Sequence, residues 1–148
     1  MRNQRVQLNS ACLTIKPQSL VSLWLKFCYS FYSIRRLQRI KMISTHILDT
    51  SLGVTAANVV VELSKYENDS WQNLATEKTN ADGRIAFDCK SEAGVYRLRF
   101  KIEEYFLKNN LKPFFVVAPV VFKIEDTNRK YHIPLLLNPY GYSTYRGS

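Results

Sequence analysis

Two histidines, His46 and His132, are the residues of this 148-residue sequence whose type best suits proton transfer. Histidine titrates near neutral pH, so its imidazole can take a proton from an attacking water molecule. Taken alone, His46 is more simply an ordinary strand residue, because most histidines do no chemistry. The sequence has neither a C-x-x-C nor an H-E-x-x-H motif, so a structural zinc site lacks ligands and we predict no metal.

An all-β sandwich is the fold expected to position these residues. Short runs rich in Val, Ile, Phe and Tyr follow Met42 and are separated by polar turns. Residues 58–63 and 95–101 have the two-residue period of half-buried strands. The run Asn80-Ala81-Asp82-Gly83 has the composition of a hairpin turn, so Arg84 is expected to open a new strand.

One short helix and two further strands complete the expected sandwich. Residues 103–110 are the one plausible helix, and the strand 114–124 contains Pro119, which implies an edge strand or a bulge. The last strand, 130–137, has its larger apolar stripe on one face. His132 lies on the opposite face, where in an assembly it would meet a partner subunit or a cleft.

The charge of the chain is unevenly distributed. Residues 1–41 carry eight Lys and Arg and no acid, whereas residues 42–148 carry thirteen basic and twelve acidic residues. The domain after Met42 is therefore close to neutral, which gives no electrostatic reason to expect a nucleic-acid partner. The row of Arg97, Arg99 and Lys101 is interpreted as one solvated strand face without a function.

Residues 1–41 are expected to lie outside the fold. The apolar stretch 19–32 is too short to span a bilayer and is interrupted by Lys26, so we predict no membrane partner. A secretory signal and a mitochondrial-type transit peptide stay open. We favour a third interpretation, in which Met42 is the true start. The cysteines form no close-spaced pair, which fits reduced thiols and a cytoplasmic location, with periplasmic or organellar targeting as the alternative.

Three segments together resemble the 5-hydroxyisourate hydrolase family of transthyretin-like proteins. They are S-T-H-I-L-D-T-S-L-G at 44–53, T-N-A-D-G-R at 79–84 and Y-H-I-P-L-L-L-N-P-Y-G-Y-S-T-Y-R-G-S at 131–148. The third is the most specific, because eighteen consecutive residues ending in Y-R-G-S rarely recur by chance, whereas D-G-R is common in hairpins. The resemblance spans residues 44–148.

The resemblance implies a transthyretin-like Greek-key β-sandwich with one short helix, assembled as a homotetramer with active sites in the channel where dimers meet. It also implies a hydrolase that needs no cofactor. Such an enzyme opens the ring of 5-hydroxyisourate by cleaving a cyclic amide, and the product is 2-oxo-4-hydroxy-4-carboxy-5-ureidoimidazoline in urate degradation.

Five residues take functional roles by this resemblance. His46, Arg84, His132 and Ser148 are expected to be catalytic, and His46, Arg84 and Tyr145 are expected to contact substrate. Histidine suits activation of water, and arginine suits a carbonyl oxygen that is becoming negative. Tyr145 could stack on a flat substrate, and the terminal carboxylate of Ser148 could orient a histidine.

The sequence departs from the family pattern at two positions. Lys130 stands where many members have a second histidine in an H-Y-H triplet, which is expected to alter pH dependence rather than abolish activity. Thr55 stands where the family often has proline after the glycine turn. We expect that second change to affect only loop stiffness.

Two other classes of function compete with the hydrolase. A transthyretin-like carrier would bind a small aromatic ligand in the same channel without converting it, and it would need no base together with an oxyanion donor. A β-sandwich interaction module would explain the strands but not the histidines. By default Arg84 would be a solvated hairpin residue, and the tyrosines near the end of the chain would be interface packing.

We predict that a chain beginning at Met42 folds and is as active as the full chain, because the sandwich motifs all lie downstream. Size-exclusion chromatography and a hydrolysis assay on both chains test this. If the shorter chain aggregated while the full chain did not, residues 1–41 would be structural.

Overall fold

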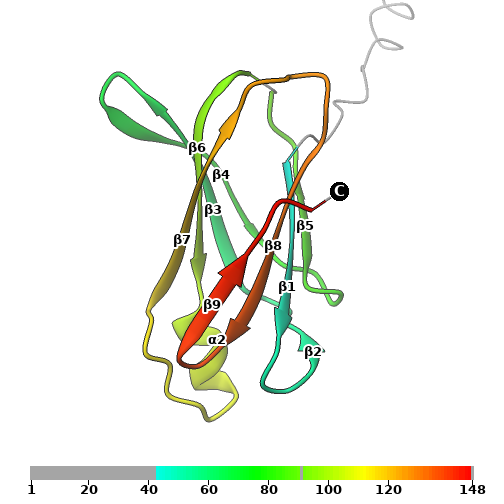
Figure 1. Cartoon of the computed structure of the whole chain (residues 1–148). Coiled ribbons are helices and arrows are strands. Elements are labelled where there is room, and N and C mark those ends of the chain that lie inside the picture. The colour runs from blue at the N-terminus through cyan, green and yellow to red at the C-terminus, as the bar shows by residue number, and fades with distance from the viewer. Residues whose placement is uncertain (1–42, 91, 148) are drawn as a thin grey trace, which may run out of the picture. The chain divides into compact units, whose positions relative to one another are not determined.

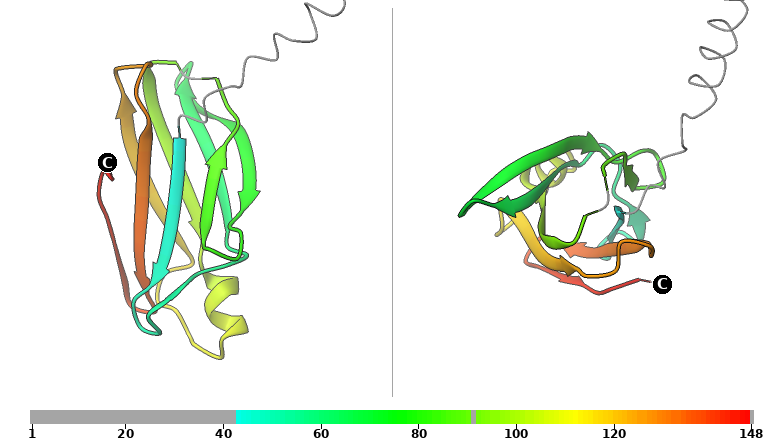
Figure 2. Two further views of the ribbon diagram at one scale, coloured as in Figure 1. Left: turned by 90° about the vertical axis from the view of Figure 1, so that its right-hand side faces the viewer. Right: turned by 90° about the horizontal axis from the view of Figure 1, so that it is seen from above.

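The computed structural model describes residues 43–90 and 92–147, and these residues form a sandwich of two β-sheets (Figures 1 and 2). Sheet A has the order β2-β1-β8-β9, with β5 also paired to β1. Its strands are β1 (Ile43–Asp49), β2 (Val54–Thr55), β5 (Arg84–Phe87), β8 (Tyr131–Asn138) and β9 (Gly141–Thr144). Sheet B has the order β4-β3-β6-β7 and contains β3 (Val60–Glu67), β4 (Ser70–Lys78), β6 (Gly94–Lys101) and β7 (Val117–Ile124).

The apolar core fills the space between the two sheets. Strands turn alternate side chains inward, so β1 shows a strict alternation of buried and half-buried residues and β6 buries Tyr96, Leu98 and Phe100. The helix α2 (Glu103–Lys108) closes one end of the sandwich and contributes the buried Phe106 (Figure 2). The prediction of an all-β sandwich with one short helix is confirmed.

Two predicted elements are shorter in the structure. The helix ends at Lys108 rather than at residue 110, because Asn110 takes a positive φ of 57° that an α-helix cannot continue. The strand predicted from 114 begins at Val117, since the Phe114 amide donates to the Pro139 carbonyl at 2.7 Å instead of to a neighbouring strand. That strand, β7, is an edge of sheet B and thereby accommodates Pro119, as predicted.

The centre of sheet A is a parallel pair formed by β1 and β8. Seven residue pairs hold the register, from Ile43 opposite Tyr131 to Asp49 opposite Leu137. The buried Thr45 hydroxyl donates to the Ile133 carbonyl at 2.6 Å across the two strands. Thr45 therefore links β1 to β8 from within the core, next to the outward residues Ser44 and His46.

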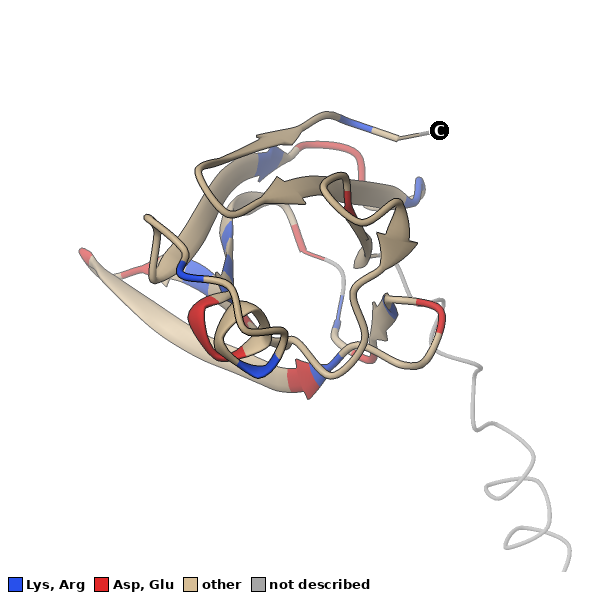
Figure 3. Ribbon diagram, turned by 90° about the horizontal axis from the view of Figure 1, so that it is seen from below, with Lys and Arg blue, Asp and Glu red and all other residues tan. Residues whose placement is uncertain are grey.

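The basic row on β6 is only partly a solvated face. Arg99 and Lys101 form ion pairs with Glu62. Arg97 is half-buried, as Arg99 is, and its guanidinium carbon lies 4.3 Å from the centre of the Trp71 ring. Over the described part of the chain, acidic and basic residues are interspersed around both sheets (Figure 3). Within this part, no helix is long and apolar enough to cross a membrane.

Candidate active site

Three of the five residues with predicted roles, namely His46, Arg84 and His132, meet on the outer face of sheet A. His46 lies opposite Arg84 in the antiparallel β1–β5 pair, so their side chains emerge as neighbours on one face. His132 lies one strand away on β8, opposite Ser44 and diagonal to His46. Positions 44 and 46 on β1 and position 132 on β8 all point away from the core, which the alternation in burial shows. One open sheet face thus carries two imidazoles and a guanidinium.

A tight turn places Arg84 at the start of β5. Gly83 has a φ of +68°, and a side chain there would bring its Cβ to 2.7 Å from the Ile47 carbonyl oxygen, so only glycine fits. The Gly83 carbonyl accepts a hydrogen bond from the Ile47 amide at 2.9 Å. The Asn80 side chain accepts one from the Arg84 amide at 2.8 Å. The turn is therefore fixed to β1, which holds Arg84 beside His46.

Thr55 has a wider effect than the loop stiffness that the sequence suggested. Its hydroxyl donates to the Ala81 carbonyl at 3.2 Å, and its Cβ would lie 3.1 Å from a Cβ at Gly83. A proline in this place would lack that hydroxyl. Thr55 therefore ties β2 to the turn that precedes Arg84. Lys130, the other departure from the family pattern, is exposed just before β8.

The surroundings of both histidines lower the pKa of the imidazole and so favour its neutral form. Burial lowers the pKa of His132, and the Arg84 and His46 charges lower it further. Burial likewise lowers the pKa of His46, followed by the Arg84 charge, while the backbone and carboxylate of Asp82 oppose these effects. A neutral imidazole has a lone pair that can accept a proton, so this environment favours basic behaviour near neutral pH.

The two imidazoles differ in access. The Nε2 atom of His46 is buried and has no hydrogen-bond partner among the described residues. The ring of His132 lines a cavity and is contacted at Nδ1 by the Ser44 hydroxyl at 2.9 Å. His132 is therefore the better placed of the two to meet water. Sequence reasoning missed Ser44, although its position two residues before His46 on a strand places both on the same face.

The tail after β9 runs back along the start of β8 (Figure 1). The Gly147 amide donates to the His132 carbonyl at 2.8 Å. A side chain at Gly147 would place its Cβ only 2.6 Å from Cδ2 of the His132 ring, so the tail backbone lies directly against the imidazole. Tyr145 is exposed, as a substrate-contacting side chain must be. The predicted role of Ser148 falls outside the described residues.

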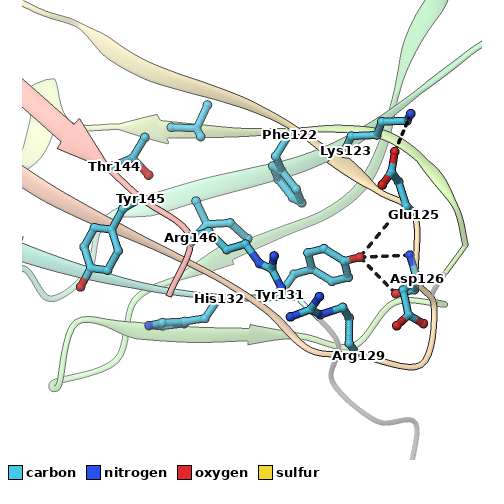
Figure 4. Close-up of a pocket in the computed structure, with 12 residues that line it drawn as sticks. Phe122, Lys123, Glu125, Asp126, Arg129, Tyr131, His132, Thr144, Tyr145 and Arg146 are labelled. Atoms are coloured by element: carbon cyan, nitrogen blue, oxygen red, sulfur yellow. Dashed lines mark hydrogen bonds and ion pairs between the residues drawn. The ribbon is translucent and has the colours of Figure 1, made fainter. Parts of the chain in front are cut away.

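A cavity of about 270 Å³ opens beside His132, between β7, β8 and the tail. Figure 4 shows His132 and Tyr145 toward one end of it and Arg129, Asp126 and Tyr131 toward the other. The cavity includes neither His46 nor Arg84. It is therefore a space next to the histidine–arginine cluster, and we place the candidate site on the open sheet face itself.

No group of three or more metal-binding side chains occurs within residues 43–90 and 92–147. The donors on the candidate face are two imidazoles and a guanidinium, and a permanently charged guanidinium repels a cation. Imidazoles are side chains suited to proton transfer, and a guanidinium is suited to stabilising an anion.

Comparison with known proteins defines the class to which this fold and site belong. The HIUase/Transthyretin family matches residues 43–147 of the chain. The chain belongs to this family, whose fold is the two-sheet sandwich described above.

The similar proteins include named hydrolases and a transthyretin. A 5-hydroxyisourate hydrolase of Halalkalibacterium halodurans is 48% identical over 115 residues, which cover 72% of this chain and 97% of the relative. The solved 5-hydroxyisourate hydrolase of Klebsiella pneumoniae is 39% identical with a TM-score of 0.64, over 72% of this chain and 97% of that one. Sea bream transthyretin in complex with thyroxine is 33% identical with a TM-score of 0.68, over 72% and 94%. The backbone fold alone therefore does not separate hydrolase from carrier.

We predict that Gly147→Ala impairs hydrolysis while leaving the fold intact, because the new methyl group must displace the His132 ring. A displacement of about 1 Å at a reacting group can cost about 100-fold in rate. Steady-state kinetics and thermal unfolding measure the two effects. Gly141→Ala is the matched control, since a Cβ there would meet only Asn138 at 3.8 Å, an ordinary contact. Equal activity in both variants would contradict the placement of the tail against His132.

Proposed function

We infer that this chain is an enzyme that opens the ring of 5-hydroxyisourate by hydrolysis, a step of urate degradation. The observation that carries this inference is the gathering of His46, Arg84 and His132 on one open face of sheet A. The named hydrolases among the relatives support it. A carrier needs a groove that fits its ligand, whereas hydrolysis needs a base and a group that stabilises an oxyanion.

We assign the activation of water to His132. Its ring borders a cavity, its pKa is lowered by burial and by the Arg84 charge, and the neutral form can therefore accept a proton near neutral pH. As water attacks the ring carbonyl, the proton passes to His132, and the carbon–nitrogen bond then breaks as the leaving nitrogen is protonated. The substrate and one water supply all the atoms of the product.

We propose that Arg84 stabilises the carbonyl oxygen of the substrate and that His46 and Tyr145 contact the substrate. A guanidinium keeps its charge and presents a planar set of donors, so it can stabilise the developing oxyanion without exchanging a proton. His46 lies opposite Arg84 in the β1–β5 pair, which places it beside the group proposed to hold the substrate carbonyl. The exposed ring of Tyr145 can stack on a flat ligand. Ser148 remains a proposed catalytic residue that lies outside the described part of the chain.

We expect His132→Asn to lower the turnover number about 100-fold or more through loss of the base, with no loss of fold, because residue 132 points away from the core. Arg84→Lys should also lower it, since an ammonium keeps the charge but loses the planar fork. The double variant should be much less than multiplicatively impaired if both residues act in one transition state. Spectrophotometric assays with freshly generated 5-hydroxyisourate test this, and near-normal turnover in both folded single variants would favour the carrier.

The pH dependence follows from the lowered pKa of His132. The base must be neutral to work, so activity is lost as the pH falls through its pKa in the folded protein. Because burial and Arg84 lower that pKa below the ordinary value of 6.5, the acid limb of the rate profile should lie below 6.5. Replacing Arg84 by Gln removes the neighbouring charge and should move the limb toward higher pH. An acid limb above 6.5 in the unaltered enzyme would argue against His132 as the base.

We propose that the enzyme is a homotetramer. The outward face of β8 carries Leu136 as well as His132, and Tyr140 after β8 and Tyr145 in the tail are 78% and 57% exposed, so apolar side chains are available for contact with a second chain. The edge strands β7 and β9 also leave backbone groups available for pairing with a second chain. Light scattering should give four times the 17.2 kDa chain mass at micromolar concentration, and a monomer mass would refute this assembly.

We also propose a cytoplasmic location, which rests on the cysteine content of the sequence. Cell fractionation with activity measured in each fraction distinguishes it from the periplasmic and organellar alternatives.

A further inference from the structure

Ser44 makes a direct contact with the proposed base that no sequence motif assigned to it. Its Oγ lies 2.9 Å from Nδ1 of His132, and the two residues are directly opposite each other in the parallel β1–β8 register. Both side chains are half-buried, so water competes weakly for this hydrogen bond. Ser44 therefore contacts the imidazole at Nδ1, whereas Nε2 is the nitrogen proposed to react.

The direction of this hydrogen bond is set by the role proposed for His132. A serine hydroxyl can donate or accept, so the contact alone does not fix the tautomer of His132. Nδ1 is engaged by Ser44, so Nε2 is the ring nitrogen left to accept a proton from water. A neutral imidazole with its lone pair on Nε2 carries its hydrogen on Nδ1, and Oγ then accepts that hydrogen.

The tautomer decides whether His132 can act as a base toward water. With its hydrogen on Nδ1, the neutral ring has its lone pair on Nε2, which points away from Ser44. With the hydrogen on Nε2, that atom could only donate. The Gly147 backbone, packed against Cδ2, limits rotation of the same ring. Ser44 and Gly147 thus restrain the imidazole at two places.

We propose that Ser44 is a positioning residue that holds the hydrogen of His132 on Nδ1 and so presents the Nε2 lone pair to the attacking water. This rests on the proposed role of His132 as the base. Among the described residues, the charges that act on this ring come from Arg84 on β5 and His46 on β1, and Tyr145 and Arg146 of the tail line the same cavity as His132.

The first test compares Ser44→Ala with Ser44→Thr by steady-state kinetics across pH. Loss of an orienting partner typically costs about tenfold or more, so Ser44→Ala should lower kcat by that factor with little change in KM. Ser44→Thr keeps the hydroxyl and should retain most of the activity. The acid limb of Ser44→Ala should move to lower pH, because the imidazolium loses an acceptor. A move to higher pH would show that the hydroxyl donates, which overturns the proposal.

The second test reads the tautomer directly. The chain contains only two histidines, so imidazole ¹⁵N spectra of the protein labelled at histidine contain two ring systems, and His132→Asn identifies one of them. In the unaltered enzyme above the acid limb, His132 should show a protonated Nδ1 and an unprotonated Nε2. A protonated Nε2 would overturn the proposal, even if Ser44→Ala failed to fold.

A matched control separates positioning from strand pairing. The Thr50 hydroxyl, directly after the end of β1, donates to the Leu137 carbonyl of β8 at 3.0 Å. Thr50→Val should leave kcat and the acid limb unchanged. If Thr50→Val and Ser44→Ala lowered kcat equally, Ser44 would have only a structural role.

The activity of His132→Asn distinguishes a failure of the proposed base from a failure of the role proposed for Ser44. If His132→Asn is inactive and Ser44→Ala is fully active with an unmoved acid limb, the role of Ser44 is wrong and the proposed base stands. If His132→Asn is itself active, the proposed base fails first. In the inactive His132→Asn background, adding Ser44→Ala should cause no further loss.

Discussion

The parallel pairing of β1 with β8 is the constraint on which the rest of the site depends. Side chains of a strand alternate between its faces, so a slip of one residue in β1 would turn Ser44 and His46 into the core and Thr45 toward solvent. The buried hydrogen bond from Thr45 to the Ile133 carbonyl opposes such a slip, because breaking it leaves polar groups without water. The register that makes the core tight therefore also brings His46 and His132 to one face.

Arg84 has two effects on this face that reinforce each other. Its positive charge disfavours protonation of both nearby imidazoles, which keeps a lone pair available at neutral pH. In the proposed mechanism the same charge also attracts the oxygen of the substrate carbonyl under attack. A lysine could supply the first effect in part, but the guanidinium provides several fixed donors in one plane. The turn closed by Gly83 holds this group in place, and within residues 43–90 and 92–147 no carboxylate forms an ion pair with it.

Local pattern predicted a large part of this arrangement. The outward direction of His132 followed from its place between Tyr131 and Ile133, and Arg84 followed from the turn composition before it. The adjacency of His46 and His132 could not be derived from local pattern, because it depends on which strands become neighbours. Backbone contacts produce no periodic pattern from which they could be predicted. Examples are Gly147 against the imidazole and Thr55 with the Ala81 carbonyl.

The separation of Ser44 and His132 along the chain, 88 residues, has a consequence for how the protein is made. Closing so long a loop is entropically unfavourable, and folds dominated by distant pairings form slowly. Sheet B joins strands that are closer in sequence, since β3 and β4 form a hairpin. During synthesis β1 emerges early and must wait for β8, the second-to-last strand, before sheet A is complete. The site is therefore assembled only at the end of folding. A nascent chain that lacks β8 exposes the apolar residues of β1, which then need protection from aggregation.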